Sequence, residues 1–124
     1  MSKLFNLIAG GVAGTLARYF LAGAVHGFLG AGFPYGTLVV NLTGCFIIGF
    51  LMSISENKFA LNTDTRLLLM VGFCGAFTTF STFIMETNSL IKDGETLRAL
   101  VNILASVAAG FLIFRIGSFV GEII

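Results

Sequence analysis

Four long apolar stretches limit what this chain of 124 residues can fold into. A helix needs about 20 apolar residues to cross the hydrocarbon core of a bilayer, because each residue adds about 1.5 Å to its length. The stretches cover approximately residues 4–29, 35–55, 67–91 and 97–121, and they leave almost nothing for a soluble domain. We therefore predict an all-α integral membrane protein in which residues 1–124 form a single domain of four transmembrane helices.

The basic residues are divided almost evenly between the two ends of the predicted bundle. Four spans place both termini on one side, and the basic residues there are Lys3, Lys58, Arg66 and Arg115. The basic residues of the other side are Lys92 and Arg98, with Arg18 added if its side chain reaches that end. An excess of Lys and Arg on one side normally fixes the orientation of a membrane protein. Because the excess is so small here, we predict that the chain inserts in both orientations.

Short loops join the predicted spans. The loop at 26–36 contains the only histidine, His26, and the glycines and proline of a turn. The loop at 55–66 offers Asp64 or Thr65 as the N-terminal cap of the third helix. In the loop at 92–96, Gly94 is placed to end the third helix and Thr96 to start the fourth.

The residue sets of common catalytic sites are missing from the sequence. It has no GxSxG, HExxH or GxxxxGK[ST] motif, and His26 has no plausible catalytic partner. Cys45 and Cys74 occur singly inside predicted spans and are interpreted as small buried hydrophobes. The net charge of +1 gives no reason to expect a nucleic-acid partner. We predict that the protein is not an enzyme.

Strongly polar side chains inside a span usually face a cavity, a partner or an ion path. Two polar stripes each occupy one helix face: Thr37, Asn41 and Gly44 in the second span, and Asn102, Ser106 and Gly110 in the fourth. Asn41 either joins two helices by hydrogen bonds or offers its amide donors to a ligand. Glu86 shares a face with Phe80 and Phe83. Its carboxylate is a candidate proton carrier, hydrogen-bond acceptor or partner for Arg18, and the sequence leaves these alternatives open.

The segment GFCGAFTTFSTF, residues 72–83, combines glycines, hydroxyl residues and phenylalanines inside the third span. Non-helical backbone at membrane depth is tolerated only where it is buried in protein or lines a cavity. We predict a broken third helix, interrupted around Gly75 to Ser81. Such a break frees carbonyl oxygens for a hard cation and amide N–H groups for an anion. Phe80 and Phe83 then share a face of the restarted helix, where the positive ring edges attract a small anion.

Several segments resemble the Fluc (CrcB) family of bacterial fluoride channels. These are GGVAGTLARY (10–19), GTLVVN (36–41), LTGCFIIG (42–49) and, most specifically, GFCGAFTTFSTF (72–83). The resemblance covers essentially the whole chain. It implies a fluoride-selective channel of the bacterial inner membrane that exports cytoplasmic fluoride passively and so gives fluoride resistance. It also implies an antiparallel, dual-topology homodimer with two pores and a structural sodium ion at its centre.

The resemblance also assigns roles to individual residues. The sodium ligands would be the main-chain carbonyls of Gly75 and Thr78 from both subunits. The residues expected along each fluoride pore are Asn41, Phe80, Phe83, Ser81, Thr82 and Ser106. The residues expected to support the pore are Thr37, Thr79, Arg18, Glu86 and Asn102. The sequence departs from the family pattern at Ala76, where a second glycine is common, and at Gly110, where a hydroxyl is expected.

Two other functions compete with a fluoride channel. A small four-span proton-coupled exporter is the main alternative, but its mechanism needs a carboxylate in the first span, and residues 4–29 contain none. A structural subunit without transport activity is the other alternative, and it leaves the polar segment of the third span unexplained.

Overall fold

The computed structural model describes residues 2–57 and 61–124, which form helices and connecting loops. The helical elements are α1 (Ser2–Leu29), α2 (Tyr35–Asn57), α3 (Thr63–Arg66), the π-helical segment η1 (Leu67–Cys74), α4 (Gly75–Phe77), α5 (Phe80–Lys92) and α6 (Thr96–Ile123). Within the described ranges, four helices are long and apolar enough to cross a membrane, and the third of them runs from Thr63 to Lys92. Each of the four predicted spans lies inside one of these helices. The chain is therefore a multi-pass membrane protein built from helices.

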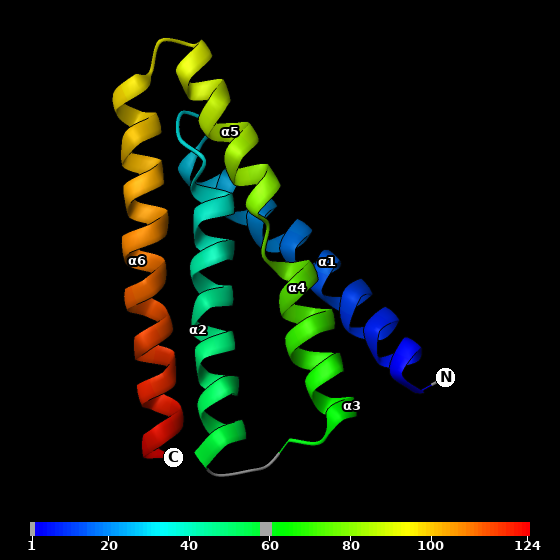
Figure 1. Cartoon of the computed structure of the whole chain (residues 1–124). Helices are drawn as coiled ribbons and strands as arrows, with labels where there is room; N and C mark the ends of the chain where they lie inside the picture. The colour runs from blue at the N-terminus through cyan, green and yellow to red at the C-terminus, as the bar shows by residue number, and fades with distance from the viewer. Residues whose placement is uncertain (1, 58–60) are drawn as a thin grey trace.

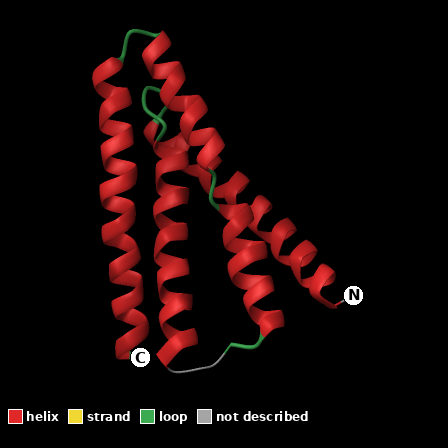
Figure 2. Ribbon diagram, in the orientation of Figure 1, coloured by secondary structure: helices red, strands yellow, loops and turns green. Residues whose placement is uncertain are grey.

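Helices α2 and α6 lie side by side along most of their length and run in the same direction (Figure 1). Helix α1 crosses the bundle obliquely and packs against η1 and α4, whereas α5 leans toward α6. The loops lie at the ends of the bundle, except for the short non-helical connection between α4 and α5 (Figure 2). The two halves of the third span therefore have different neighbours.

Glycines allow the closest contacts between these helices. A Cβ atom at Gly10 of α1 would overlap the carbonyl oxygen of Leu68 in η1. A Cβ atom at Gly117 of α6 would overlap the carbonyl oxygen of Phe46 in α2. Small residues let helices approach closely in lipid, where van der Waals packing drives association.

The helical backbone of the third span is interrupted at Thr78 and Thr79. Thr78 has φ −87° and ψ 157°, Thr79 has φ −150° and ψ 114°, and both are extended. The interruption is narrower than the predicted stretch, because Gly75 has helical angles of φ −62° and ψ −36° and Ser81 lies in α5. The π-helical hydrogen bonding of η1, directly before it, was not predicted. Such wide turns are rare and occur frequently at functional sites.

The predicted helix ends at the 92–96 loop are correct, and the predicted cap in the 55–66 loop is wrong. Gly94 has φ +77° and follows α5, and α6 begins at Thr96 as predicted. The prediction of Asp64 or Thr65 as the cap of the third span is wrong, because Asn62 is the cap and its side chain accepts the Thr65 N–H at 2.8 Å.

The predicted loop position of His26 is also wrong, because α1 continues to Leu29 and places His26 in its last turn. Lys58, predicted to lie in the 55–66 loop, is outside the described residues.

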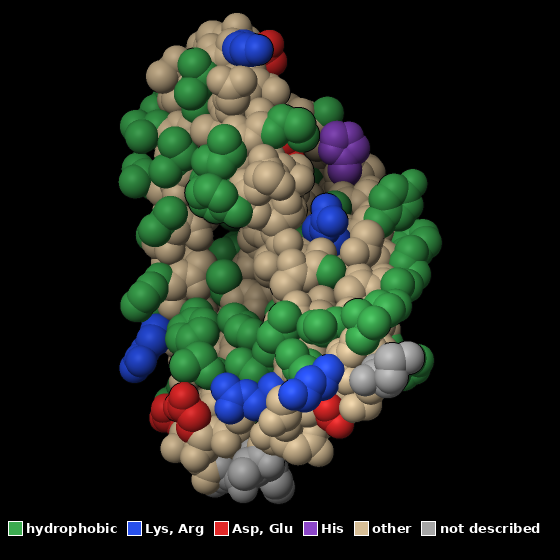
Figure 3. Space-filling model, turned by 45° about the vertical axis from the view of Figure 1, so that its right-hand side comes forward, with side chains coloured by type: hydrophobic (Ala, Val, Ile, Leu, Met, Phe, Trp, Pro, Cys, Tyr) green, Lys and Arg blue, Asp and Glu red, His purple; other side chains and the backbone are tan. Residues whose placement is uncertain are grey.

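The surface of the folded chain is largely apolar. Most charged side chains on the face in Figure 3 gather at its two ends, and hydrophobic side chains cover much of the band between them. Large apolar residues remain exposed on the outer helices, for example Phe5 at 69% and Val107 at 66%. A surface of this kind suits contact with lipid or with another protein chain.

Candidate functional site

The side chain of Asn41 binds both backbone polar groups of Thr79. Asn41 Nδ2 donates to the Thr79 carbonyl at 3.1 Å, and the Thr79 N–H donates to Asn41 Oδ1 at 2.8 Å. An unpaired backbone group costs several kcal/mol in an environment without water. The amide of α2 therefore replaces the helical partners that Thr79 lacks, and it stabilises the interruption. The Nδ2 group keeps a second N–H for another acceptor.

The start of α5 leaves two backbone donors free. Thr79 caps this helix, because its Oγ1 accepts the Thr82 N–H at 3.3 Å. The Thr79 and Thr82 hydroxyl groups also bond to each other at 3.0 Å. The N–H groups of Phe80 and Ser81 have no acceptor within residues 2–57 and 61–124. Free amides at the positive end of a helix dipole favour a negative ligand.

The carbonyl groups next to the interruption are also freed. In a continuous helix the Thr79 N–H would donate to the Gly75 carbonyl. Here it donates to Asn41 instead, so the Gly75 carbonyl loses this donor. Neither the Gly75 nor the Thr78 carbonyl oxygen accepts a backbone hydrogen bond from any described residue. Gly75 is exposed on the surface of the chain. Oxygen atoms of this kind are suitable ligands for a hard cation.

Arg18 and Glu86 have separate partners, although both line one cavity. Arg18 Nε donates to the Ala76 carbonyl at 3.0 Å, so the guanidinium compensates the negative end of α4. Glu86 Oε1 accepts a hydrogen bond from the Thr37 hydroxyl. Among the alternatives left open by the sequence, Glu86 acts as a hydrogen-bond acceptor here, and no ion pair with Arg18 occurs in the described part of the chain.

Two open cavities meet at the interruption. One, of about 660 Å³, lies between α1, α2 and α5, and its polar lining includes Arg18, His26, Thr37, Thr79, Thr82 and Glu86. The other, of about 380 Å³, is lined by Asn41, Gly44, Gly75, Thr78, Thr79 and Phe80, among others. Since Thr79 lines both, the interruption lies between them. Nine of the predicted site residues named here thus gather around this point from the first three spans.

The rings of Phe80 and Phe83 lie next to each other. Their centroids are 5.7 Å apart and their planes meet at 51°. Phe83 is buried, with 7% of its surface exposed, whereas 74% of Phe80 is exposed. The neighbouring Ser81 is exposed as well. Most of the Phe80 ring is therefore free of contacts with the described part of this chain.

The site residues that were predicted in α6 lie apart from the interruption at Thr78 and Thr79. Asn102 is only 2% exposed, and its Nδ2 donates to Thr87 Oγ1 at 2.9 Å. Thr87 in turn donates to the Phe83 carbonyl at 2.7 Å. Ser106 and Gly110 line a third groove together with Cys45. The sequence analysis missed Thr87, whose only signal was a hydroxyl four residues after Phe83, on the same helix face.

Gly44 is required where α2 passes the interruption. A Cβ atom at this position would overlap the methyl group of Thr78. Thr78 cannot rotate away freely, because its hydroxyl donates to the Cys74 carbonyl at 2.9 Å. We expect Gly44→Ala to lower the free energy of unfolding by about 1–3 kcal/mol, seen as a lower midpoint of thermal unfolding in detergent. Gly11→Ala is the control, because a Cβ atom at Gly11 meets nothing within 4 Å. Equal midpoints for the two variants would contradict the close contact.

Comparison with known proteins gives consistent matches along the chain. The family model for CrcB-like protein, Camphor Resistance (CrcB), matches residues 5–118. A relative from Desulforapulum autotrophicum, named fluoride-specific ion channel FluC, is 46% identical over 125 residues, covering 100% of both chains. A relative of the same name from Dehalococcoides mccartyi is 44% identical over 124 residues, covering 100% of this chain and 95% of its own. Another, from Geobacter metallireducens, is 53% identical over 97 residues, which is 78% of each chain.

Proposed function

The chain belongs to the CrcB family, and from this premise we propose that it is a fluoride-selective channel that lets fluoride leave the cytoplasm of a bacterial cell passively. The relatives named above are ion channels, in agreement with the prediction that the chain is not an enzyme. The observation that best supports a path for an anion is the pairing of Asn41 with Thr79. It fixes an interruption in the third span and leaves amide donors free at membrane depth.

Passive export needs no energy source other than the membrane potential. Fluoride enters cells as neutral HF from acidic surroundings and dissociates in the cytoplasm. A potential of about 100 mV, negative inside, favours the exit of one negative charge by ~2.3 kcal/mol. A selective pore in the inner membrane is then sufficient for fluoride resistance.

Conduction requires that the pore replace the water of a small, strongly hydrated ion. The second N–H of Asn41 and the free N–H groups at the start of α5 supply hydrogen-bond donors. The hydroxyl groups of Ser81, Thr82 and Ser106 and the ring edges of Phe80 and Phe83 supply weaker contacts. Together these contacts make entry of the ion favourable. Each contact alone is too weak to trap the ion, so the ion also leaves the pore. The narrow passage excludes larger halides.

Two antiparallel copies of the chain form the channel in this proposal. The small Lys and Arg bias between the two ends permits both orientations. Phe80 is mostly exposed on the protomer, and Ser106 lies in a different groove from Asn41. A second copy packed on these faces would complete two pores, each lined by residues of both chains.

The freed carbonyl groups of Gly75 and Thr78 fit a structural sodium ion between the two copies. Both oxygens are without backbone donors among the described residues, and Gly75 is exposed where a second copy would pack. When bound there, the ion would supply a fixed positive charge between the pores and hold the copies together.

Fluoride efflux from liposomes that contain the purified protein tests the proposed function. With a membrane potential and no pH gradient, we expect fluoride to leave rapidly and chloride to stay inside, compared with protein-free liposomes. Chloride efflux as fast as fluoride efflux would exclude a selective fluoride channel. Fluoride flux that appears only with a pH gradient would favour the proton-coupled exporter.

A further inference from the structure

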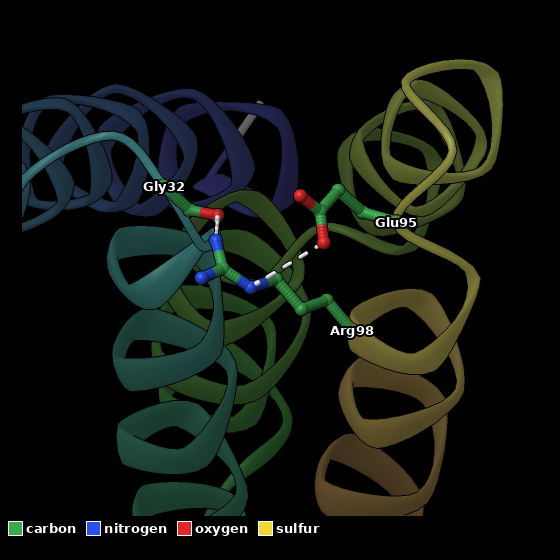
Figure 4. A network of polar contacts seen from close by, with 3 residues as sticks. All are labelled: Gly32, Glu95 and Arg98. Atoms are coloured by element: carbon green, nitrogen blue, oxygen red, sulfur yellow. Dashed lines mark hydrogen bonds and ion pairs between the residues drawn. The ribbon is translucent and has the colours of Figure 1, made fainter.

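Arg98 lies at one end of the bundle, where it connects α6 with the loop that follows α1. Its Nη1 donates to the Gly32 carbonyl at 2.8 Å, and its Nε lies 3.7 Å from Glu95 Oε2. Figure 4 shows the guanidinium reaching from α6 across to Gly32, with Glu95 on its other side. The Arg98 and Glu95 side chains are 52% and 51% exposed. The hydrogen bond to Gly32 therefore holds a cationic group in place while much of it stays accessible.

A groove of about 560 Å³ extends from Arg98 along the bundle surface. Apart from Arg98 and Gly32, its lining is apolar or aromatic and includes Leu29, Phe33, Tyr35, Leu38, Val101 and Ala105. The distance along α6 from Arg98 to Ala105 is about 10 Å at the usual helical rise. The groove thus has a cationic rim at the end of a transmembrane helix and an apolar floor that extends toward the middle of the membrane.

The occupant that matches this arrangement is a lipid with a negative headgroup. A guanidinium binds phosphate through paired N–H donors, and basic pockets between transmembrane helices hold anionic headgroups. The apolar floor has room for an acyl chain. A soluble phosphate ion has no acyl chain and would leave this floor empty. We propose that this groove binds one anionic phospholipid, with its phosphate on Arg98 and an acyl chain between α2 and α6. The proposal is independent of the ion that the channel conducts.

Glu95 competes with the lipid for Arg98. Its ion pair is solvent-exposed, and exposed ion pairs contribute little to stability. A phosphate group therefore replaces the carboxylate at little cost, and removal of the carboxylate strengthens lipid binding. The two neighbouring charges therefore affect lipid binding in opposite directions, and a basic residue at the same end of the bundle but outside the groove distinguishes a specific headgroup site from general attraction.

Native mass spectrometry of the purified protein in detergent tests the proposal, with phosphatidylglycerol and phosphatidylcholine of identical acyl chains added together. We expect the wild type to retain phosphatidylglycerol preferentially. Arg98→Gln should lower this preference about fivefold, the usual effect of one basic residue near an anionic surface. Glu95→Gln should raise the preference. Ala105→Phe should reduce phosphatidylglycerol retention by filling the apolar floor, and soluble glycerol phosphate should not displace the lipid.

The matched control is Lys92→Gln, which removes a positive charge at the same end of the bundle but does not line the groove. We expect it to keep the wild-type preference. An equal loss in Lys92→Gln and Arg98→Gln would overturn the proposal, because the attraction would then be unspecific. A wild-type preference in Arg98→Gln, as expected if a second protein chain covers the groove, would overturn it too. If Arg98→Gln does not fold, Glu95→Gln takes its place as the test. A preference for phosphatidylglycerol no higher than that of the wild type in Glu95→Gln would then overturn the proposal.

Discussion

Asn41→Asp is expected to abolish fluoride efflux from liposomes. The carboxylate cannot donate to the Thr79 carbonyl, which now accepts from Asn41 Nδ2 at 3.1 Å. It also places a negative charge beside that carbonyl and beside the proposed path of an anion. An uncompensated charge in a buried position costs about 3 kcal/mol or more. Since about 1.4 kcal/mol corresponds to a factor of ten, we expect efflux to fall roughly a hundredfold or more, measured with a fluoride electrode.

Asn57→Asp is the matched control for this variant. Asn57 ends the same helix, and among the described residues its side chain makes only a long contact of 3.5 Å with Ser53 Oγ. The same chemical change there should leave fluoride efflux close to the wild-type rate. Equal rates for Asn41→Asp and Asn57→Asp would show that the Asn41 amide is not part of the fluoride path.

Phe80→Ile is expected to lower fluoride efflux strongly without destabilising the protomer. The ring is 74% exposed on the protomer, so the substitution removes little buried surface there. In the proposed pore it removes a ring edge, and a favourable aromatic edge contact contributes about 1.5 kcal/mol at most. We therefore expect efflux to fall roughly tenfold, with an unchanged midpoint of thermal unfolding in detergent.

Phe5→Ile makes the same change at a phenylalanine of α1 that is 69% exposed. It should keep the wild-type efflux rate, because Phe5 lines none of the cavities at the interruption. If both variants conduct like the wild type, then Phe80 does not face the ion. If both lose flux equally, the effect is a general one on exposed apolar surface.

The four spans could be predicted from the sequence because their lengths follow directly from the thickness of the membrane. The region of the interruption could also be predicted, since glycines and hydroxyl residues are unusual there. Its location at Thr78 and Thr79 could not, because it depends on a side chain of another helix. Asn41 is 38 residues away from Thr79 in the sequence, and only the fold brings the two together.

The same reason explains which contacts of the candidate site were missed. The bond of Arg18 to the Ala76 carbonyl joins residues 58 positions apart, and that of Asn102 to Thr87 crosses from α6 to α5. The cap of the third span was misplaced because Asn62 and Asp64 are equally suitable residue types. The pore-lining roles of Phe80 and Ser106 stay predictions, because they depend on a second copy of the chain.

Antiparallel pairing of two copies is tested most directly by thiol labelling of intact cells. The variant Asp93→Cys, in a chain with Cys45 and Cys74 replaced by alanine, places a single thiol in the exposed turn after α5. A membrane-impermeant maleimide should label about half of the copies from outside, because an antiparallel pair presents this turn on both sides of the membrane. Labelling of all copies, or of none, would show a single orientation and would contradict the antiparallel channel.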